Sequence, residues 1–168
     1  MDEVIVRTRI RVPPSEAFAF LTDFPGYAKY SEYLKEVRAD GDGGPGTAYE
    51  LDVAWWKLSY TAHTEVVDVE EPARIRWRVT EAVDAHGAWE IEPVDDGTDS
   101  EVTLRIFFDA DSADRSAVNL PRFVSIGWVI DRVKPLVVRE AEDVVERIVA
   151  DLEGEPRPVD LTIETRRS

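Results

Sequence analysis

The chain has 168 residues, no cysteine, and 35 acidic against 20 basic side chains, which gives a formal net charge of −15 at pH 7. This length suits one domain with one hydrophobic core. The lack of cysteine excludes disulfides, thiol catalysis and cysteine-based metal sites, and the charge disfavours nucleic acid and anionic membranes, since both need a basic surface.

The basic residues comprise sixteen arginines and only four lysines. A carboxylate-rich surface with few lysine side chains predicts a halophile-like protein, whose self-repulsion is screened by salt. The first eleven residues alternate charged and apolar side chains, unlike a signal peptide, and no run of about 18 apolar residues occurs. We therefore expect no membrane insertion and a cytoplasmic location.

The N-terminal region predicts a half-buried strand followed by two short helices. Apolar and charged side chains alternate from Glu3 to Val12, which is the two-residue period of a strand. The Pro13-Pro14 pair ends that strand, and an apolar side on residues 17–22 predicts the first helix. The Pro25-Gly26 pair breaks this helix, and a second is expected over residues 27–34.

Six further segments alternate apolar and polar side chains, and turn residues separate them. They cover residues 34–39, 48–55, 58–66, 75–79, 87–91 and 102–108. With the first strand they predict a seven-stranded, mostly antiparallel sheet with one apolar face. The other face is charged, and its arginines, such as Arg74 and Arg76, are expected to pair with Glu90 and Glu92 on the next strand.

The C-terminal region predicts one long amphipathic helix from Arg122 to Leu152, because apolar residues recur there every three or four positions. Pro135 lacks the N–H that would continue the helical hydrogen bonds, so we expect a bend. Gly154 favours the end of the helix. We divide the chain into a ligand-binding domain, residues 1–154, and a tail, residues 155–168.

Apolar side chains alternate in the tail at Val159, Leu161 and Ile163. We expect the tail to add an edge strand, to pack on a groove, or otherwise to be mobile.

A sheet with one apolar face must bury it, and the long helix is the one predicted element that is long enough to cover it. The order of elements resembles that of the START-like superfamily. The supporting motifs are Val-Pro-Pro-Ser-Glu-Ala-Phe at residues 12–18, Thr-Asp-Phe-Pro-Gly-Tyr at 22–27 and Glu-Glu-Pro-Ala-Arg-Ile-Arg-Trp at 70–77. Within the superfamily the chain is most similar to the polyketide cyclase/dehydrase and lipid-transport family.

This resemblance implies an α+β helix-grip fold, in which a curved sheet wraps around the C-terminal helix and leaves a hydrophobic cavity. It also implies ligands such as lipids, isoprenoid quinones or polyketides, with catalysis in a minority of members. The predicted inward registers place an unusual number of aromatic side chains at such a cavity. The candidate ligand-binding residues are Tyr27, Tyr30, Trp55, Tyr60, Trp77, Trp89, Phe108 and Trp128. The alternative is that these rings simply fill the core.

The titratable residues do not predict an enzyme. His63 and His86 fall in outward-facing registers, and no Ser-His-Asp arrangement forms on the inner face, so we assign no catalytic residue, no metal site and no cofactor. Glu140, Arg139 and Asp52 are candidates for the cavity mouth. The sequence favours a binder or carrier of a hydrophobic small molecule. A cyclase or dehydratase acting on aromatic or polyketide-like substrates and a protein-interaction module are the alternatives, and the oligomeric state is left open.

Overall fold

The computed structural model describes residues 2–23, 26, 29–55, 58–109, 112, 118–119 and 126–166. Strands dominate the first two thirds of the chain, and one long helix follows them. In chain order the elements are β1 (Asp2–Ile10), α1 (Pro14–Thr22), β2 (Leu34–Asp40), β3 (Ala48–Trp55), β4 (Leu58–Glu70), β5 (Arg74–Val79), β6 (Asp84–Val94), the short 3-10 helix η2 (Asp95–Gly97), β7 (Asp99–Asp109), β8 (Val118–Asn119), α2 (Ile126–Glu153) and β9 (Thr162–Arg166).

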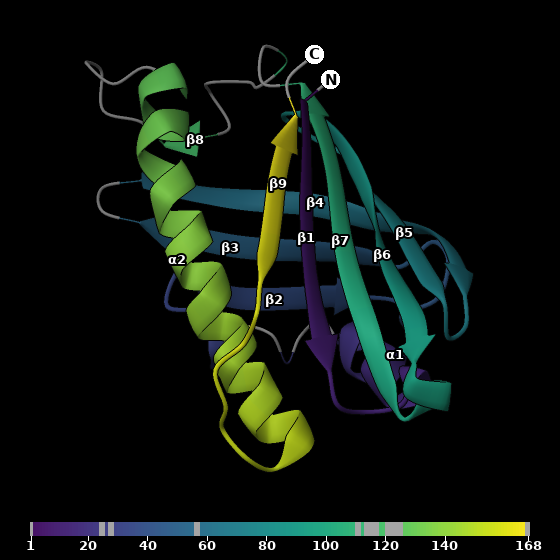
Figure 1. Ribbon diagram of the computed structural model, residues 1–168. Helices are drawn as coiled ribbons and strands as arrows, with labels where there is room; N and C mark the ends of the chain where they lie inside the picture. Colours follow the sequence, from purple (N-terminus) through teal and green to yellow (C-terminus); the bar gives the residue numbers. More distant parts are fainter. Residues whose placement is uncertain are drawn as a thin grey trace.

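All strands belong to one sheet, in the order β2-β3-β4-β5-β6-β7-β1-β9, and β8 pairs with β4. Each neighbouring pair is antiparallel. The sheet is strongly curved: β2, β3 and β4 pass behind α2, and β9 lies alongside β1 on the side nearer the helix (Figure 1). The predicted α+β helix-grip fold is therefore confirmed.

The seven predicted strands are present as β1 to β7, and two more join the sheet. One is β8, with two residues; the other is β9, the edge strand that the alternation in the tail allowed. β9 pairs with β1 from Glu3↔Arg166 to Arg7↔Thr162, so it covers the edge that β1 would otherwise expose.

The two short helices differ from expectation. α1 forms behind Pro13 and buries Ala17, Phe18 and Leu21, which confirms the first helix. A second α-helix reaching Leu34 is wrong, because β2 already begins at Leu34. The hydroxyl oxygen of Ser31 accepts hydrogen bonds from the backbone N–H groups of Tyr33 and Leu34, at 3.1 and 3.2 Å. In a helix these N–H groups would bond backbone carbonyls instead, so the Ser31 side chain competes with helix formation.

The helix α2 ends as the sequence predicts. Gly154 follows it with a φ of +83°, a left-handed conformation that glycine adopts without steric cost, and its N–H bonds the carbonyl of Ala150 at 3.1 Å. Pro135 lies inside α2 and is exposed, and the start predicted at Arg122 lies outside the described residues. Among the helices of the described chain, none is long and apolar enough to span a bilayer.

The packed core lies at the α1 end of the molecule. Phe18 and Leu21 of α1 contact a cluster of buried residues that includes Val66, Ile75 and Ile91 on the inner face of the sheet. Because α1 covers only this end, the remaining inner face lies opposite α2, and the two do not fill the space between them.

The outer face carries the predicted ion pairs, but the partners differ. Arg74 pairs with Glu70 at 2.8 Å and Arg78 pairs with Glu65 at 3.1 Å, so these arginines contact β4 or its turn instead of β6. Glu90 of β6 pairs with Arg105 of β7. The expected pairing with Glu90 was wrong because each residue of a central strand has neighbours on both sides, and the sequence does not rank them.

Candidate functional site: an apolar cavity between the sheet and α2

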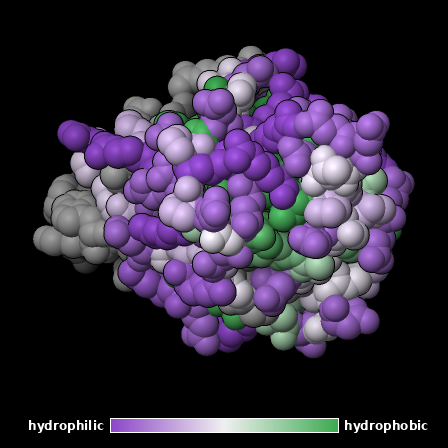
Figure 2. Space-filling model, turned by 60° about the horizontal axis from the view of Figure 1, so that its bottom comes forward, coloured by the Kyte–Doolittle hydropathy of each residue, from purple (hydrophilic) through white to green (hydrophobic). Residues whose placement is uncertain are grey.

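A cavity of about 710 Å³ lies between the inner face of the sheet and α2. Protein interiors normally contain few voids larger than a water molecule, so a cavity of this volume is far larger than ordinary gaps in packing. It falls within the range of about 300–1,000 Å³ that small-molecule sites occupy. Figure 2 shows hydrophobic residues gathered between hydrophilic ones on the face at the lower end of Figure 1.

The sheet supplies most of the lining. β1 contributes the alternating residues from Val4 to Ile10, and β7 contributes Val102, Leu104 and Ile106 on the same face, in agreement with the pairing Val6↔Leu104. β3 and β4 add Leu51, Val53, Trp55, Ser59 and Tyr60, and β6 adds Trp89. These positions share one face because side chains alternate along a strand.

The helix supplies the opposite wall through one stripe. Its lining residues are Glu140, Ala141, Val144, Val145, Ile148 and Leu152. Their spacing of three and four positions places them on one side of α2. Val138, on the same helix, is 43% exposed and lies on another side of it.

The segment before β2 forms a third wall and is tied to α2 by polar contacts. The Tyr30 hydroxyl donates to Asp151 at 2.6 Å, and the Glu32 N–H donates to the carboxylate of Glu140 at 3.1 Å. Burial, followed by the bond to Asp151, raises the pKa of Tyr30. These contacts hold Tyr30, Ser31, Tyr33 and Leu34 against the cavity.

The C-terminal tail closes a fourth side. Leu161 lines the cavity, and the Thr8 hydroxyl donates to the carbonyl of Asp160 at 3.2 Å. Where the tail leaves α2, the Arg157 guanidinium bonds both carboxylate oxygens of Glu153, at 2.8 and 2.9 Å. Arg157 also donates to the carbonyl of Arg9 at 2.9 Å, which joins the tail to β1.

The structure brings four of the eight candidate residues together: Tyr30, Trp55, Tyr60 and Trp89 line the cavity. Tyr27 lies outside the described residues. That the four residues contact a ligand stays a prediction.

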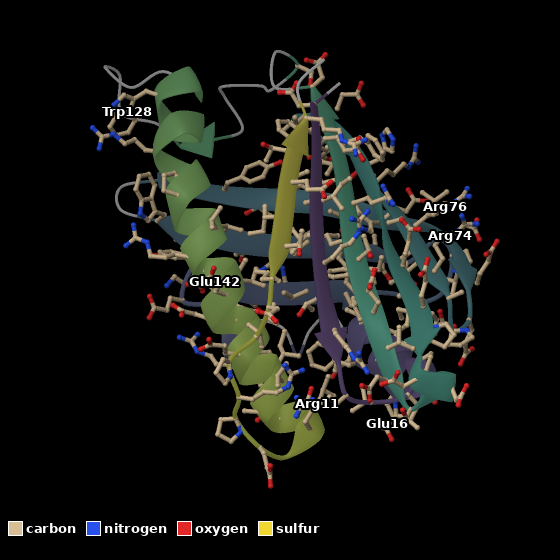
Figure 3. The ribbon with its side chains drawn as sticks, in the orientation of Figure 1. Arg11, Glu16, Arg74, Arg76, Trp128 and Glu142 are labelled. Carbon is tan, nitrogen blue, oxygen red and sulfur yellow. The ribbon has the colours of Figure 1, made fainter. Side chains whose placement is uncertain are left out.

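Three candidates lie elsewhere. Trp77 is outside the lining, and its ring lies against Gly87, where a Cβ atom would come within 2.6 Å of the ring. Phe108 is also outside the lining, which on β7 extends only to Ile106. Trp128 is 39% exposed, with the guanidinium of Arg132 5.4 Å from its ring centroid, and it points away from the sheet (Figure 3). Strand register indicates the inner face but not which part of it borders the cavity.

The lining residues that the sequence did not single out are mainly aliphatic, together with Phe20 and Tyr33. The same alternation that located Trp55 also located Leu51 and Val53, so these residues were identifiable as inward but not as bordering a cavity. Leu161 was not identifiable, because its position depends on the return of the tail to β1.

The titratable groups near the cavity are sparse. Glu140 is the one charged residue of the described lining. Arg139 is exposed, and Asp52 pairs with Arg38 at 2.6 Å; the hydrogen bond from Arg38, followed by that from Thr61, lowers the pKa of Asp52. His63 lies near Glu50 and Glu81. Within the described part of the chain, no three residues gather that would hold a metal ion.

In the helix-grip class of START-like proteins, a curved antiparallel sheet wraps around a long C-terminal helix and an apolar cavity lies between them. The fold described above has this arrangement. The family model for polyketide cyclase/dehydrase and lipid transport matches residues 1–153. The chain belongs to this family.

Solved structures share this fold at low sequence identity. The protein TTHA0849 from Thermus thermophilus is 18% identical, with a TM-score of 0.64 over 90% of this chain and 97% of that one. The ZhuI aromatase/cyclase from Streptomyces sp. R1128 is 16% identical, with a TM-score of 0.65 over 91% and 94%. A START superfamily protein from Mycobacterium smegmatis is 16% identical, with a TM-score of 0.63 over 90% and 99%. Among curated proteins, none matched.

Proposed function

We propose that this protein binds and carries a hydrophobic small molecule, such as a lipid, an isoprenoid quinone or a polyketide-like compound, in the cavity between the sheet and α2. The observation that carries the proposal is the size and the apolar lining of this cavity, about 710 Å³. The cavity is large enough to admit water, and an apolar ligand of matching shape would replace this water with close dispersion contacts to the lining. Burial of its apolar surface supplies the driving force for binding.

The test uses two variants of one helix. Val144 lines the cavity, whereas Val138 lies on an exposed side of α2. Titration with a fluorescent apolar probe such as N-phenylnaphthylamine should give saturable binding to the unmodified protein. Val144→Trp places an indole in the cavity and is expected to weaken binding at least tenfold, and Val138→Trp should leave it unchanged.

Two outcomes would contradict the proposal. One is a protein that does not bind the probe, and the other is equal affinity in the Val144→Trp and Val138→Trp variants. Native mass spectrometry of protein purified from its own source gives an independent measurement, because a retained ligand adds a discrete mass.

A second candidate function is a cyclase or dehydratase reaction on aromatic or polyketide-like substrates. It is favoured by one observation, namely that the carboxylate of Glu140 belongs to the lining. A carboxylate at an otherwise apolar wall can accept a proton from a bound substrate. This function is tested by incubating the protein with a neutral poly-β-ketone and measuring the absorbance of an aromatic product. Glu140→Gln should abolish product formation. If the unmodified protein binds the substrate but forms no product, the enzymatic function is excluded and the carrier function remains.

The third function that the sequence allowed, a protein-interaction module, has less support in the described part of the chain. Its large exposed hydrophobic residues are Val67 on β4 and Trp128 and Val138 on α2. Such dispersed residues are normal on a protein surface.

A further inference from the structure

The C-terminal tail forms one side of the cavity, although it lies outside the part of the chain that the family model matches, residues 1–153. The tail leaves α2 at the lower end of Figure 1 and rises to β9, on the side of β1 that is nearer the helix. Leu161 of this segment belongs to the cavity lining. This chain therefore adds a wall to the cavity after the last residue that the family model covers.

The tail turns an apolar face toward the cavity. Val159, Leu161 and Ile163 are partly buried, whereas Thr162 between them is exposed. Ile163 lies directly opposite Val6, which lines the cavity from β1, and opposite residues of an antiparallel pair share one face of the sheet. The tail thus covers the cavity by an apolar face without being enclosed by other elements.

The attachment of the tail is slight. β9 is the last strand of the sheet and pairs only with β1, over five residue pairs. None of residues 155–166 is fully buried. The ion pair between Arg7 and Glu164 has a length of 3.7 Å, and both side chains are more than one-third exposed, so it contributes little. Edge segments with few buried contacts open locally at a lower cost than global unfolding.

The other described walls are held more firmly. β7 has a neighbouring strand on each side, and Val149 of α2 is fully buried. The segment before β2 is tied to α2 by the bond from Tyr30 to Asp151 and by the Arg147 guanidinium, which donates to the Tyr30 carbonyl. Among the described walls, the tail is therefore the one that opens at the least cost.

Release of the tail would uncover the cavity from the side. The strand order ends in β7-β1-β9, so β1 becomes the edge of the sheet when β9 leaves. Val4, Val6 and Thr8 of β1, which line the cavity, would then lie at that edge. An apolar ligand passing over this edge meets the lining directly.

We propose that residues 155–166 act as a strap, and that its release from β1 lets the ligand enter and leave between β1 and α2. Arg157 is the latch of this strap, because it joins Glu153 of α2 to the carbonyl of Arg9 on β1. The inference rests on the proposed binding function and adds the route of exchange. A strap of this kind sets the rates of binding and release, whereas the lining sets the affinity.

The experiment locks the strap with a reversible cross-link. Arg7→Cys combined with Thr162→Cys places two thiols directly opposite each other on β1 and β9, and the unmodified chain has no cysteine to compete. Opposite Cα atoms lie about 4.5–5.5 Å apart, within the range of about 4.4–6.8 Å that disulfides span. Neither residue belongs to the lining.

Release of N-phenylnaphthylamine is followed by mixing the loaded protein with excess β-cyclodextrin, which takes up the free probe. The disulfide should slow release at least tenfold and slow association by the same factor, so that the affinity changes by less than about twofold. Dithiothreitol should restore both rates in the same sample, which separates the effect of the lock from any effect of the substitutions.

The control cross-link joins two strands away from the tail. Arg76→Cys combined with Ala88→Cys places the thiols opposite each other on β5 and β6, and neither residue belongs to the lining. Its oxidation should leave both rates unchanged.

A second pair of variants loosens the strap. Arg157→Ala removes the latch and should speed probe release at least tenfold, because a buried ion pair is lost. Arg166→Ala removes an exposed contact of β9 and should change the rate by no more than about twofold.

The proposal is overturned if the probe leaves the oxidised and the reduced Arg7→Cys/Thr162→Cys protein at the same rate, because the ligand then uses another opening. It is also overturned if the control cross-link slows release as much, since general stiffening of the sheet would then be the cause. In both cases the probe still binds, so the proposed function stands. If the probe binds neither the reduced nor the unmodified protein, the proposed function fails and the strap with it.

Discussion

Replacing Arg157 with alanine removes the group that ties the C-terminal tail to the end of α2. Arg157 makes a two-pronged ion pair with Glu153 and a further hydrogen bond to the carbonyl of Arg9. The side chains of Arg157 and Glu153 are only 19% and 8% exposed, so solvent screens the pair weakly. The variant leaves the Glu153 carboxylate nearly buried, and among the described residues the backbone N–H of Arg11 at 2.9 Å is the donor that remains.

The magnitude follows from this geometry. Hydrogen bonds to charged groups contribute about 1.5–3 kcal/mol, and removing one partner of a fully buried ion pair costs about 3–5 kcal/mol. Because this pair lies at the rim, we expect Arg157→Ala to lower the free energy of unfolding by about 3 kcal/mol. For a chain of this size the melting temperature should fall by roughly 6–12 °C.

Urea unfolding measures this loss, and amide hydrogen exchange locates it. Exchange should accelerate in β9 and in the part of β1 that pairs with it, because the tail loses its anchor. The control is Arg166→Ala in the same tail, whose side chain is 67% exposed and lies 4.0 Å from Glu3. This change should cost no more than about 0.5 kcal/mol. Equal losses in the two variants would refute the reasoning.

The same contact predicts a dependence on pH. The hydrogen bond from Arg157, and then that from the Arg11 N–H, lower the pKa of Glu153 in the folded protein despite its burial. The unfolded chain therefore takes up a proton at Glu153 more readily, and the stabilisation is fully present above the unfolded pKa of about 4.3. It is lost as the pH falls through the folded pKa, so the difference between the Arg157→Ala variant and the unmodified protein should shrink in acid.

Three further predictions concern the rest of the molecule. Gly87→Ala should lower the free energy of unfolding, measured in urea, by more than about 3 kcal/mol, because the new Cβ would lie 2.1 Å from the Arg105 carbonyl oxygen. The control is Gly97→Ala, whose Cβ would contact no other atom but whose φ is +86°; it should cost about 1 kcal/mol. Molar KCl should raise the melting temperature, since salt screens a net charge of −15, and an unchanged value would contradict the halophile-like interpretation. Pro135→Ala should change the affinity for the apolar probe while the melting temperature changes little. A lower melting temperature with unchanged probe affinity would show that Pro135 contributes to packing alone.

Much of the fold follows from the local spacing of apolar residues along the chain. The two-residue alternation of β3, predicted over residues 48–55, and the three- to four-residue spacing of the stripe that ends at Leu152 depend only on which side chains face the same way. These patterns determined the strands, the long helix and the apolar inner face. They also sufficed to place Trp55 and Tyr60 on that face.

Tertiary structure decided which inward residues border the cavity. Trp77 has the expected inward register, but its ring covers Gly87, whose missing side chain leaves room for it, and the lining on β7 stops before Phe108. Trp128 lies on an exposed side of α2. Such outcomes depend on the curvature of the sheet and on where α2 crosses it, and no local period encodes either.

The tail shows most clearly the difference between what a local sequence pattern predicts and what tertiary structure decides. The alternation of Val159, Leu161 and Ile163 allowed a strand, yet the partner of that strand is β1, at the other end of the chain. The contact from Thr8 to Asp160 spans 152 positions, and the anchor at Arg157 joins the end of α2 to β1. The sequence by itself determined the inner face and its apolar character. Only the folded chain decided that the tail lines one side of the cavity, because this feature depends on contacts between distant segments.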